Sequence, residues 1–139
     1  MKLLILNGPN LNLLGTREPE IYGDTSLGDL ETVLNGKYHE HQLVWKQSNH
    51  EGELIDILHN AQEEFDGVVM NPAAYGHTSI ALSDCLAAID IRVVEVHISQ
   101  VFSREEMRRN LLCAPFVEAF ISGFGVNGYE IAIKHFLDE

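Results

Sequence analysis

Glu95 and His97 are the residues whose types and spacing point most directly to chemistry. They stand two positions apart in the run VVEVHIS (93–99), whose β-branched residues predict a strand. Residues i and i+2 of a strand point to the same side, so the carboxylate and the imidazole should be neighbours. A carboxylate beside an imidazole fixes its tautomer and favours general acid or base chemistry. The alternative is a satisfied surface histidine on an edge strand. The flanking valines instead favour a buried central strand, where an unpaired glutamate would be unfavourable.

A long loop follows the first predicted strand. Residues 8–23 contain Asn10, and they contain Arg17 and Tyr22 five positions apart. Loops longer than about 12–15 residues in compact domains are usually functional lids or disordered, although a purely structural loop is the alternative. The loop has no GxGxxG pattern and no P-loop lysine, so it gives only weak support to nucleotide binding.

The run NPAAYGHTS (71–79) joins a predicted strand to an apolar helix. Asn71 and His77 near the start of that helix could bind an anion or hydroxyl groups. Capping of the helix by Thr78 or Ser79 is the competing interpretation. Asp84 lies about two turns further along the same helix.

Arg104, Arg108 and Arg109 gather just after the strand that carries the glutamate and the histidine. The chain has 9 Lys and Arg residues against 21 Asp and Glu residues, a net charge of −12. A local excess of cations in such an acidic chain suggests that the site takes an anionic small molecule. Salt bridges to Glu105 and Glu106 along a helix face are the alternative.

The composition is that of one ordinary globular domain of 139 residues. The acidic balance argues against nucleic acid and anionic membranes as partners, because both attract an excess of Lys and Arg. No run approaches the ~18 apolar residues of a membrane span, and the apolar run within residues 1–7 is too short for a signal peptide. Cys85 and Cys113 lie in apolar contexts, so we expect reduced thiols and a cytoplasmic protein.

Metal and serine-hydrolase chemistry have little support in the sequence. No GxSxG elbow occurs. Four histidines lack cysteine partners and a recognised zinc-ligand spacing: His39, His41, His50 and His59. We therefore expect no metal site.

Short β-rich runs alternate with helical periodicity along the whole chain. The predicted strands are Lys2–Asn7, Gln42–Gln47, Gly67–Asn71, 91–98 and 117–123. The predicted helices span 27–34 with Ser26 as N-cap, 54–61, 78–89, 103–112 with a Ser103–Glu106 capping box, and 129–136. This alternation predicts a single α/β domain over residues 1–139, with a flavodoxin-like arrangement and a five-stranded parallel sheet. Ligands of such sheets bind beyond the carboxyl ends of the strands, where the polar residues named above converge.

Six segments, in order, resemble the type II 3-dehydroquinate dehydratases, small flavodoxin-like enzymes of the shikimate and quinate pathways. The segments are ILNGPNLNLLGTREPEIYG, SNHEGELID, NPAAYGHTSIAL, EVHIS, REEMRRN and GFGVNGY, and together they run from Leu4 to Tyr129. The resemblance implies dehydration of 3-dehydroquinate to 3-dehydroshikimate by anti elimination through an enolate. It also implies that the reaction needs no metal or cofactor and no Schiff-base lysine.

The resemblance implies five catalytic positions. Tyr22 looks like the base that takes the proton from the carbon beside the ketone, and Arg17 looks like the lid cation that favours its phenolate. His97 resembles the general acid that protonates the departing hydroxyl, with Glu95 as its orienting carboxylate. Asn10 is similar to the family residue that helps to hold a water molecule against the enolate oxygen.

The resemblance also implies how the substrate is held. Its carboxylate would be bound by Asn71 and by the backbone N–H groups of Ile98 and Ser99. Its ring hydroxyls would contact His77 and Arg108.

The family has a mobile site cover, to which Arg104 would belong. It assembles as a dodecamer of trimers, which implies a homododecamer here, with Asp84 reaching a neighbour's site. Four positions depart from the family pattern and bear on substrate affinity and subunit contacts: Gly76 in place of threonine or another larger residue, Ser83 in place of a frequent arginine, and Asn110 and Leu111 in place of histidine and serine.

Two alternatives stay open at the level of sequence. The same reaction could serve quinate catabolism instead of the shikimate pathway, which leads to chorismate and the aromatic amino acids. The chain could also be a non-enzymatic flavodoxin-like module that binds flavin or serves in signalling. Such a module needs a phosphate-cradling loop or an acidic phospho-acceptor pair after the first strand, where this sequence has Asn, Leu, Arg and Tyr.

Overall fold

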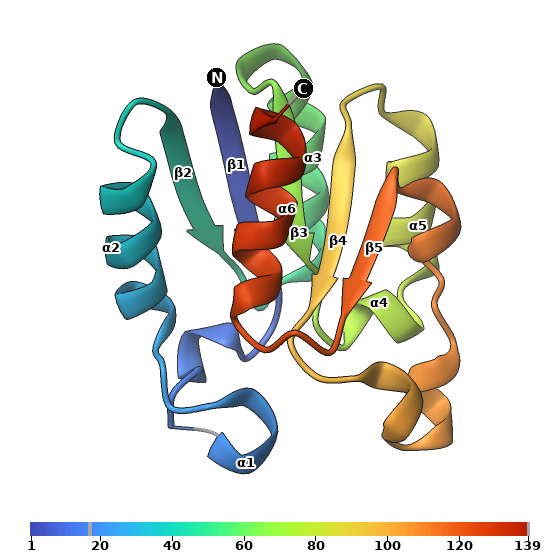
Figure 1. Cartoon of the computed structure of the whole chain (residues 1–139). Helices are drawn as coiled ribbons and strands as arrows, with labels where there is room; N and C mark the ends of the chain where they lie inside the picture. The colour runs from blue at the N-terminus through green and yellow to red at the C-terminus, as the bar shows by residue number, and fades with distance from the viewer. Residues whose placement is uncertain (17, 139) are drawn as a thin grey trace.

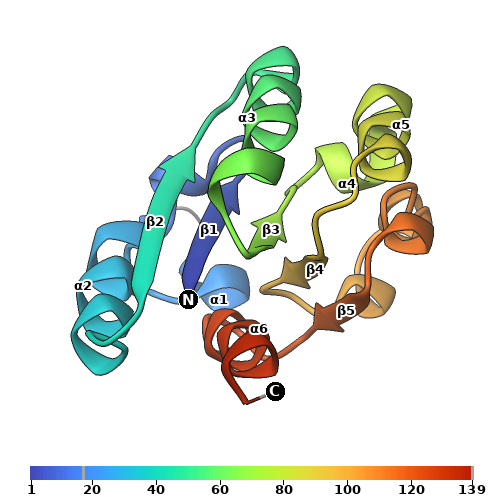
Figure 2. The ribbon, with the colours of Figure 1, turned by 90° about the horizontal axis from the view of Figure 1, so that it is seen from above.

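The computed structural model describes residues 1–16 and 18–138. Five parallel strands form one sheet in the order β2-β1-β3-β4-β5, and helices cover both of its faces (Figure 1 and Figure 2). The strands are β1 (Lys2–Asn7), β2 (Gln42–Gln47), β3 (Gly67–Asn71), β4 (Val93–His97) and β5 (Ala119–Ser122). This is the flavodoxin-like strand order, which confirms the predicted fold class.

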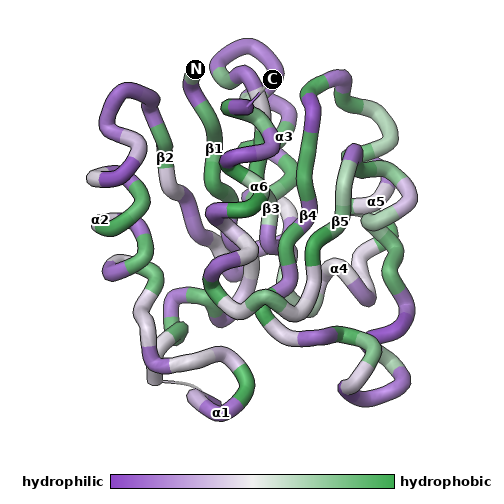
Figure 3. The backbone as a smooth tube through the Cα atoms, in the orientation of Figure 1, coloured by the Kyte–Doolittle hydropathy of each residue, from purple (hydrophilic) through white to green (hydrophobic). Residues whose placement is uncertain are grey.

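The apolar core lies in two layers, one on each face of the sheet. Leu3 and Ile5 of β1 pack on the side of α2 (Leu27–Lys37) and α6 (Asn127–Leu137). Leu4 and Leu6 pack on the side of α3 (Glu51–Glu64) and α5 (Ile80–Ala88). Successive side chains of a strand point to opposite faces, so strands that are buried on both faces read as continuous apolar runs. Figure 3 shows these hydrophobic runs on the central strands.

Helices α2 and α5 begin where a serine side chain accepts a hydrogen bond from a free backbone N–H group. Ser26 caps α2 as predicted, with its hydroxyl accepting from the N–H of Asp29 at 3.0 Å while the Asp29 carboxylate accepts from the N–H of Ser26. Two further helices, α1 (Pro19–Tyr22) and α4 (Tyr75–Thr78), are single turns. Among the described residues, no helix is long and apolar enough to cross a bilayer.

Two predicted helices differ from the structure. The helix predicted over 78–89 is α5, which begins at Ile80 because Ser79 is extended and its hydroxyl accepts from the N–H of Leu82. The prediction of a helix over 103–112 is wrong. That region holds the 3-10 turns Val101–Ser103 and Glu106–Arg109, and no residue of the second turn is buried. Short helices need a packed apolar face to persist, and this segment has none. Ser103 therefore caps no helix, and its hydroxyl donates to the Gln100 carbonyl.

The carboxyl ends of the strands meet at the lower edge of the sheet in Figure 1. The segments that cross this edge are α1, α4 and the turns after β4. The predicted loop 8–23 contains two of the short elements, the 3-10 turn Leu11–Leu13 and α1. These connections enclose the hollow described next.

Candidate active site

A cavity opens at the carboxyl edge of the sheet between the segments that follow β1, β3 and β4. It holds about 490 Å³ of empty space, counted to its open mouth. Nine of the predicted site residues line it: Asn10, Tyr22, Asn71, His77, His97, Ile98, Ser99, Arg104 and Arg108.

Glu95 and His97 form a buried pair at the end of β4. Glu95 Oε1 lies 2.7 Å from His97 Nε2, and the two side chains are 0% and 6% exposed. Since β4 lies between β3 and β5, the edge-strand alternative is wrong and the predicted central strand is confirmed. With Nε2 engaged by the carboxylate, Nδ1 is the ring nitrogen left to exchange a proton with a ligand. Glu95 Oε2 is buried without a hydrogen-bond partner among the described residues, so the carboxylate acts mainly on the histidine.

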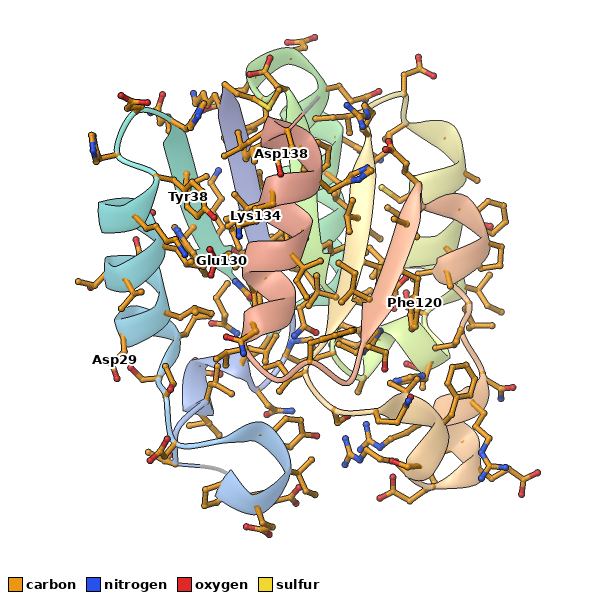
Figure 4. All side chains as sticks on the ribbon, viewed as in Figure 1. Asp29, Tyr38, Phe120, Glu130, Lys134 and Asp138 are labelled. Atoms are coloured by element: carbon orange, nitrogen blue, oxygen red, sulfur yellow. The ribbon has the colours of Figure 1, made fainter. Side chains whose placement is uncertain are left out.

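Two close neighbours of this pair were not anticipated from the sequence. The ring of Phe120 on β5 (labelled in Figure 4) lies 5.4 Å from that of His97. A Cβ on Gly76 would lie 3.2 Å from Glu95 Oε1 and 3.3 Å from His97 Cε1. The departure from the family pattern at position 76 therefore lies against the buried pair and not at a remote surface.

His77 is a neutral hydrogen-bond acceptor toward the cavity. Its Nδ1 lies 2.8 Å from the carbonyl oxygen of Asn110, and a carbonyl can only accept, so Nδ1 carries the proton. Burial lowers the pKa of His77, the nearby His97 and Arg108 lower it further, and the Asn110 contact opposes them. A neutral ring protonated at Nδ1 leaves the lone pair of Nε2 for a donor such as a ligand hydroxyl.

Arg104 places a cation on Tyr22, the last residue of α1. Its Nη1 donates to Tyr22 Oη at 2.6 Å, and its guanidinium lies 5.3 Å from the centre of the ring. The Tyr22 hydroxyl and the Arg104 guanidinium are therefore paired at the wall of the cavity, which both residues line. Arg17, the partner expected for Tyr22 from the family resemblance, lies outside the described residues.

The segment that holds Arg104, Arg108 and Arg109 also forms salt bridges, which the alternative interpretation of these arginines expected. Glu105 Oε2 lies 2.7 Å from Arg108 Nε and 3.8 Å from Arg104 Nε. Both arginines also line the cavity, so ion pairing and a cationic rim coexist. Arg109 is exposed and does not line the cavity.

The backbone at the cavity is held in unusual conformations. Asn10 and Ala73 have φ of 69° and 52°, a left-handed region that non-glycine residues occupy at a cost of about 1–3 kcal/mol. Gly8 is needed for close approach, because a Cβ there would lie 2.5 Å from the Pro72 carbonyl oxygen. The loops after β1 and β3 are thus in direct contact at the site.

The structure places Asp84 and Tyr129 differently from what their motifs suggest. Asp84 is exposed on α5 and does not line this chain's cavity. Tyr129, predicted only as part of an apolar helix stripe, is fully buried and bonded to Asn71. A buried tyrosine hydroxyl usually needs a polar partner. The tyrosine at the end of the GFGVNGY motif, on an otherwise apolar helix stripe, could therefore have indicated a buried hydrogen bond. Within the described residues, no three His, Cys, Asp or Glu side chains gather to hold a metal ion.

Comparison with known proteins gives consistent matches over nearly the whole chain. A family model described as "Dehydroquinase class II" matches residues 1–137. A 3-dehydroquinate dehydratase of Bacillus pumilus is 52% identical, covering 98% of this chain and 94% of the relative. A protein of Talaromyces marneffei named "Catabolic 3-dehydroquinase" is 51% identical, covering 96% of this chain and 77% of the relative. The crystal structure of a type II dehydroquinase from Butyrivibrio crossotus is similar with a TM-score of 0.94 and 43% identity, covering 100% of this chain and 98% of the other.

Proposed function

The chain belongs to the class II dehydroquinase family, and on that premise we propose a role for each residue of its cavity. The activity is that of a hydro-lyase: 3-dehydroquinate loses water and becomes 3-dehydroshikimate. The family match over residues 1–137 carries this conclusion. The same match favours this enzyme over the alternative of a non-enzymatic flavodoxin-like module.

Tyr22 acts as the base. Its phenolate takes a proton from the carbon beside the ketone, and the C–H electron pair moves into an enolate. The support for this role is the 2.6 Å hydrogen bond from Arg104 to Tyr22 Oη at the cavity wall. Arg17 would add a second cation from the same loop, and Asn10 would help to hold a water molecule against the enolate oxygen.

His97 acts as the acid, and we call Glu95 and His97 the acid pair. As the enolate collapses, the C–O bond breaks, a C=C bond forms, and the imidazolium gives its proton to the departing hydroxyl, which leaves as water. The buried carboxylate at 2.7 Å stabilises the imidazolium and holds Nε2, so the proton leaves from Nδ1.

The remaining cavity residues hold the substrate in place. Asn71 and the backbone N–H groups of Ile98 and Ser99 bind its carboxylate. The neutral His77 accepts a hydrogen bond from a ring hydroxyl through Nε2, and Arg108 donates to another. Fixed donors and acceptors of this kind turn binding energy into orientation of the reacting carbons.

The test of the activity is incubation of the purified protein with 3-dehydroquinate. The product has a C=C bond conjugated to a carboxylate and a ketone, so a near-ultraviolet band should grow with time. No growth of that band under conditions where a type II relative turns over would overturn the assignment.

The biological setting is part of the same proposal. We place the reaction in the shikimate pathway, with quinate catabolism as the alternative because one relative carries a catabolic name. The free, buried Cys85 and Cys113 suit the reducing cytoplasm.

We propose a homododecamer in which Asp84 reaches a neighbour's cavity. Its helix α5 also presents Ile80, which is 69% exposed, on the outside of the subunit. Light scattering should give a large oligomer, and Asp84→Ala should weaken activity or assembly. A fully active monomer would contradict this arrangement.

A further inference from the structure

The GFGVNGY motif ends in Tyr129, a residue to which the proposed reaction gives no role. Tyr129 lies in the first turn of α6, fully buried behind Asn71, which lines the cavity. Its hydroxyl lies between the ends of β1 and β3. It donates to Asn7 Oδ1 at 2.6 Å and accepts from Asn71 Nδ2 at 2.9 Å. Burial raises the pKa of Tyr129 well above its ordinary value, so the hydroxyl keeps its proton.

These contacts allow only one orientation of the Asn71 amide. A hydroxyl has a single hydrogen, and the oxygen of Asn7 takes it, so the hydroxyl can only accept from Asn71. The amide nitrogen must therefore face Tyr129. Independently, the N–H of Ala73 donates to Asn71 Oδ1 at 3.0 Å, which requires the amide oxygen on that side. Two contacts of opposite polarity therefore hold the Asn71 amide in one of its two possible orientations.

The orientation matters because the amide N–H group attracts a carboxylate, whereas the amide oxygen repels it. Within the described residues, Tyr129 uses one of the two hydrogens on Nδ2, which leaves the other for a ligand in the cavity. A flipped amide would instead present an oxygen to an anion and repel it. The flip would also remove the acceptor for the N–H of Ala73, whose backbone is held at a φ of 52°.

We propose that Tyr129 is a positioning residue whose hydroxyl holds the Asn71 amide with its N–H toward the substrate carboxylate. The proposal rests on the role given to Asn71 above. It extends the site by one layer, from the cavity wall through Asn71 to a helix that does not line the cavity.

The experiment is a double-mutant cycle on kcat and KM with 3-dehydroquinate. Tyr129→Phe removes only the hydroxyl and should raise KM about tenfold, the equivalent of one good hydrogen bond to a charged group, with a smaller change in kcat. Asn71→Ala should also raise KM. In the double variant the loss of the hydroxyl should add nothing further, because the amide that it positions is gone.

Tyr38→Phe is the matched control. It also removes only a tyrosine hydroxyl from a hydrogen bond that involves α6, since Tyr38 Oη at the end of α2 donates to Glu130 Oε1 of α6 at 2.7 Å (Figure 4). Neither residue lines the active-site cavity. Tyr38→Phe should therefore keep the wild-type KM, whatever its effect on the unfolding temperature.

A second variant covers the case in which Tyr129→Phe does not fold. Asn7→Ala removes the acceptor of the hydroxyl proton, so the hydroxyl becomes free to donate toward Asn71 and favour the flipped amide. It should raise KM in the same direction, again only when Asn71 is present.

Four results would be contrary, and together they identify three different failures. A wild-type KM in folded Tyr129→Phe, or the same rise with and without Asn71, would overturn the positioning role. A wild-type KM in Asn71→Ala would overturn the role of Asn71 and the proposal with it. An inactive wild-type protein would overturn the function itself.

Discussion

Replacing Glu95 with glutamine removes one negative charge from the acid pair and changes its shape very little. Glu95 is fully buried, and its Oε1 lies 2.7 Å from His97 Nε2. A glutamine oxygen still accepts from Nε2–H, so the imidazole keeps its tautomer. What is lost is the negative charge of the acceptor, which makes the hydrogen bond to His97 stronger than a neutral one.

The size of the effect follows from the kind of hydrogen bond. A hydrogen bond to a charged group contributes about 1.5–3 kcal/mol and a neutral one about 0.5–1.5 kcal/mol. The difference of about 1–1.5 kcal/mol predicts a kcat lower by about five- to tenfold. His97→Ala deletes the proposed acid and should lower kcat by about 10²–10⁴-fold.

The assay is kcat at saturating 3-dehydroquinate, followed by product absorbance, with urea unfolding to confirm that both variants are folded. A wild-type kcat would show that the charge has no role. A loss as large as that of His97→Ala would show that Glu95 does more than orient and stabilise the histidine.

Three other perturbations test different parts of the structure. Arg104→Gln removes the cation from the proposed base and should lower kcat about 10- to 100-fold; a wild-type kcat in the folded variant would count against the role. Gly76→Ala brings a methyl group to 2.9 Å from Pro72 Cγ and to within 3.2–3.3 Å of the acid pair, and it should lower kcat a few-fold. Gly36→Ala in α2, where a Cβ meets nothing within 4 Å, should leave kcat unchanged and add about 0.5–1 kcal/mol of stability; equal kcat in the two variants would remove the steric argument. Hydrogen bonds from Arg92, and then from His135, lower the pKa of Glu118 to about 2. The stability that this carboxylate contributes is therefore present above about pH 4.5 and is lost as the pH falls through about 2. Urea unfolding of Glu118→Gln should differ from wild type by at most about 1 kcal/mol at pH 6, because the pair is partly exposed, and the difference should shrink as the pH falls toward and below about 2; a difference that keeps its full size in acid would contradict this.

The sequence predicted the sheet and the acid pair because both depend on local pattern. Alternation of strand and helix periodicity fixes a parallel α/β sheet, and the carboxyl ends of its strands then meet at one edge. The two-residue spacing of Glu95 and His97 places them on one side of a strand whatever the rest of the chain does. The other eight predicted residues that line the cavity came from motifs that follow strand ends, with roles implied by the family resemblance.

The contacts between distant loops could not be predicted in this way. Tyr22 and Arg104 are 82 positions apart, and Asn71 and Tyr129 are 58 positions apart. Periodicity reports which face of an element is buried but not which loops meet across the edge of the sheet. The helix wrongly predicted after β4 has the same origin, because a capping pattern was present without an apolar face to pack.

Exchange of the proton beside the ketone is the measurement that most directly tests the central claim, that Tyr22 is the base and His97 the acid of this dehydration. In deuterated water, His97→Ala should still exchange that proton from 3-dehydroquinate while forming product slowly, because the base is intact and only the departing hydroxyl lacks its proton donor. Tyr22→Phe keeps the ring but deletes the proton acceptor, and it should neither exchange the proton nor form product. If Tyr22→Phe exchanges the proton at the wild-type rate, another group is the base and the account of this site is wrong.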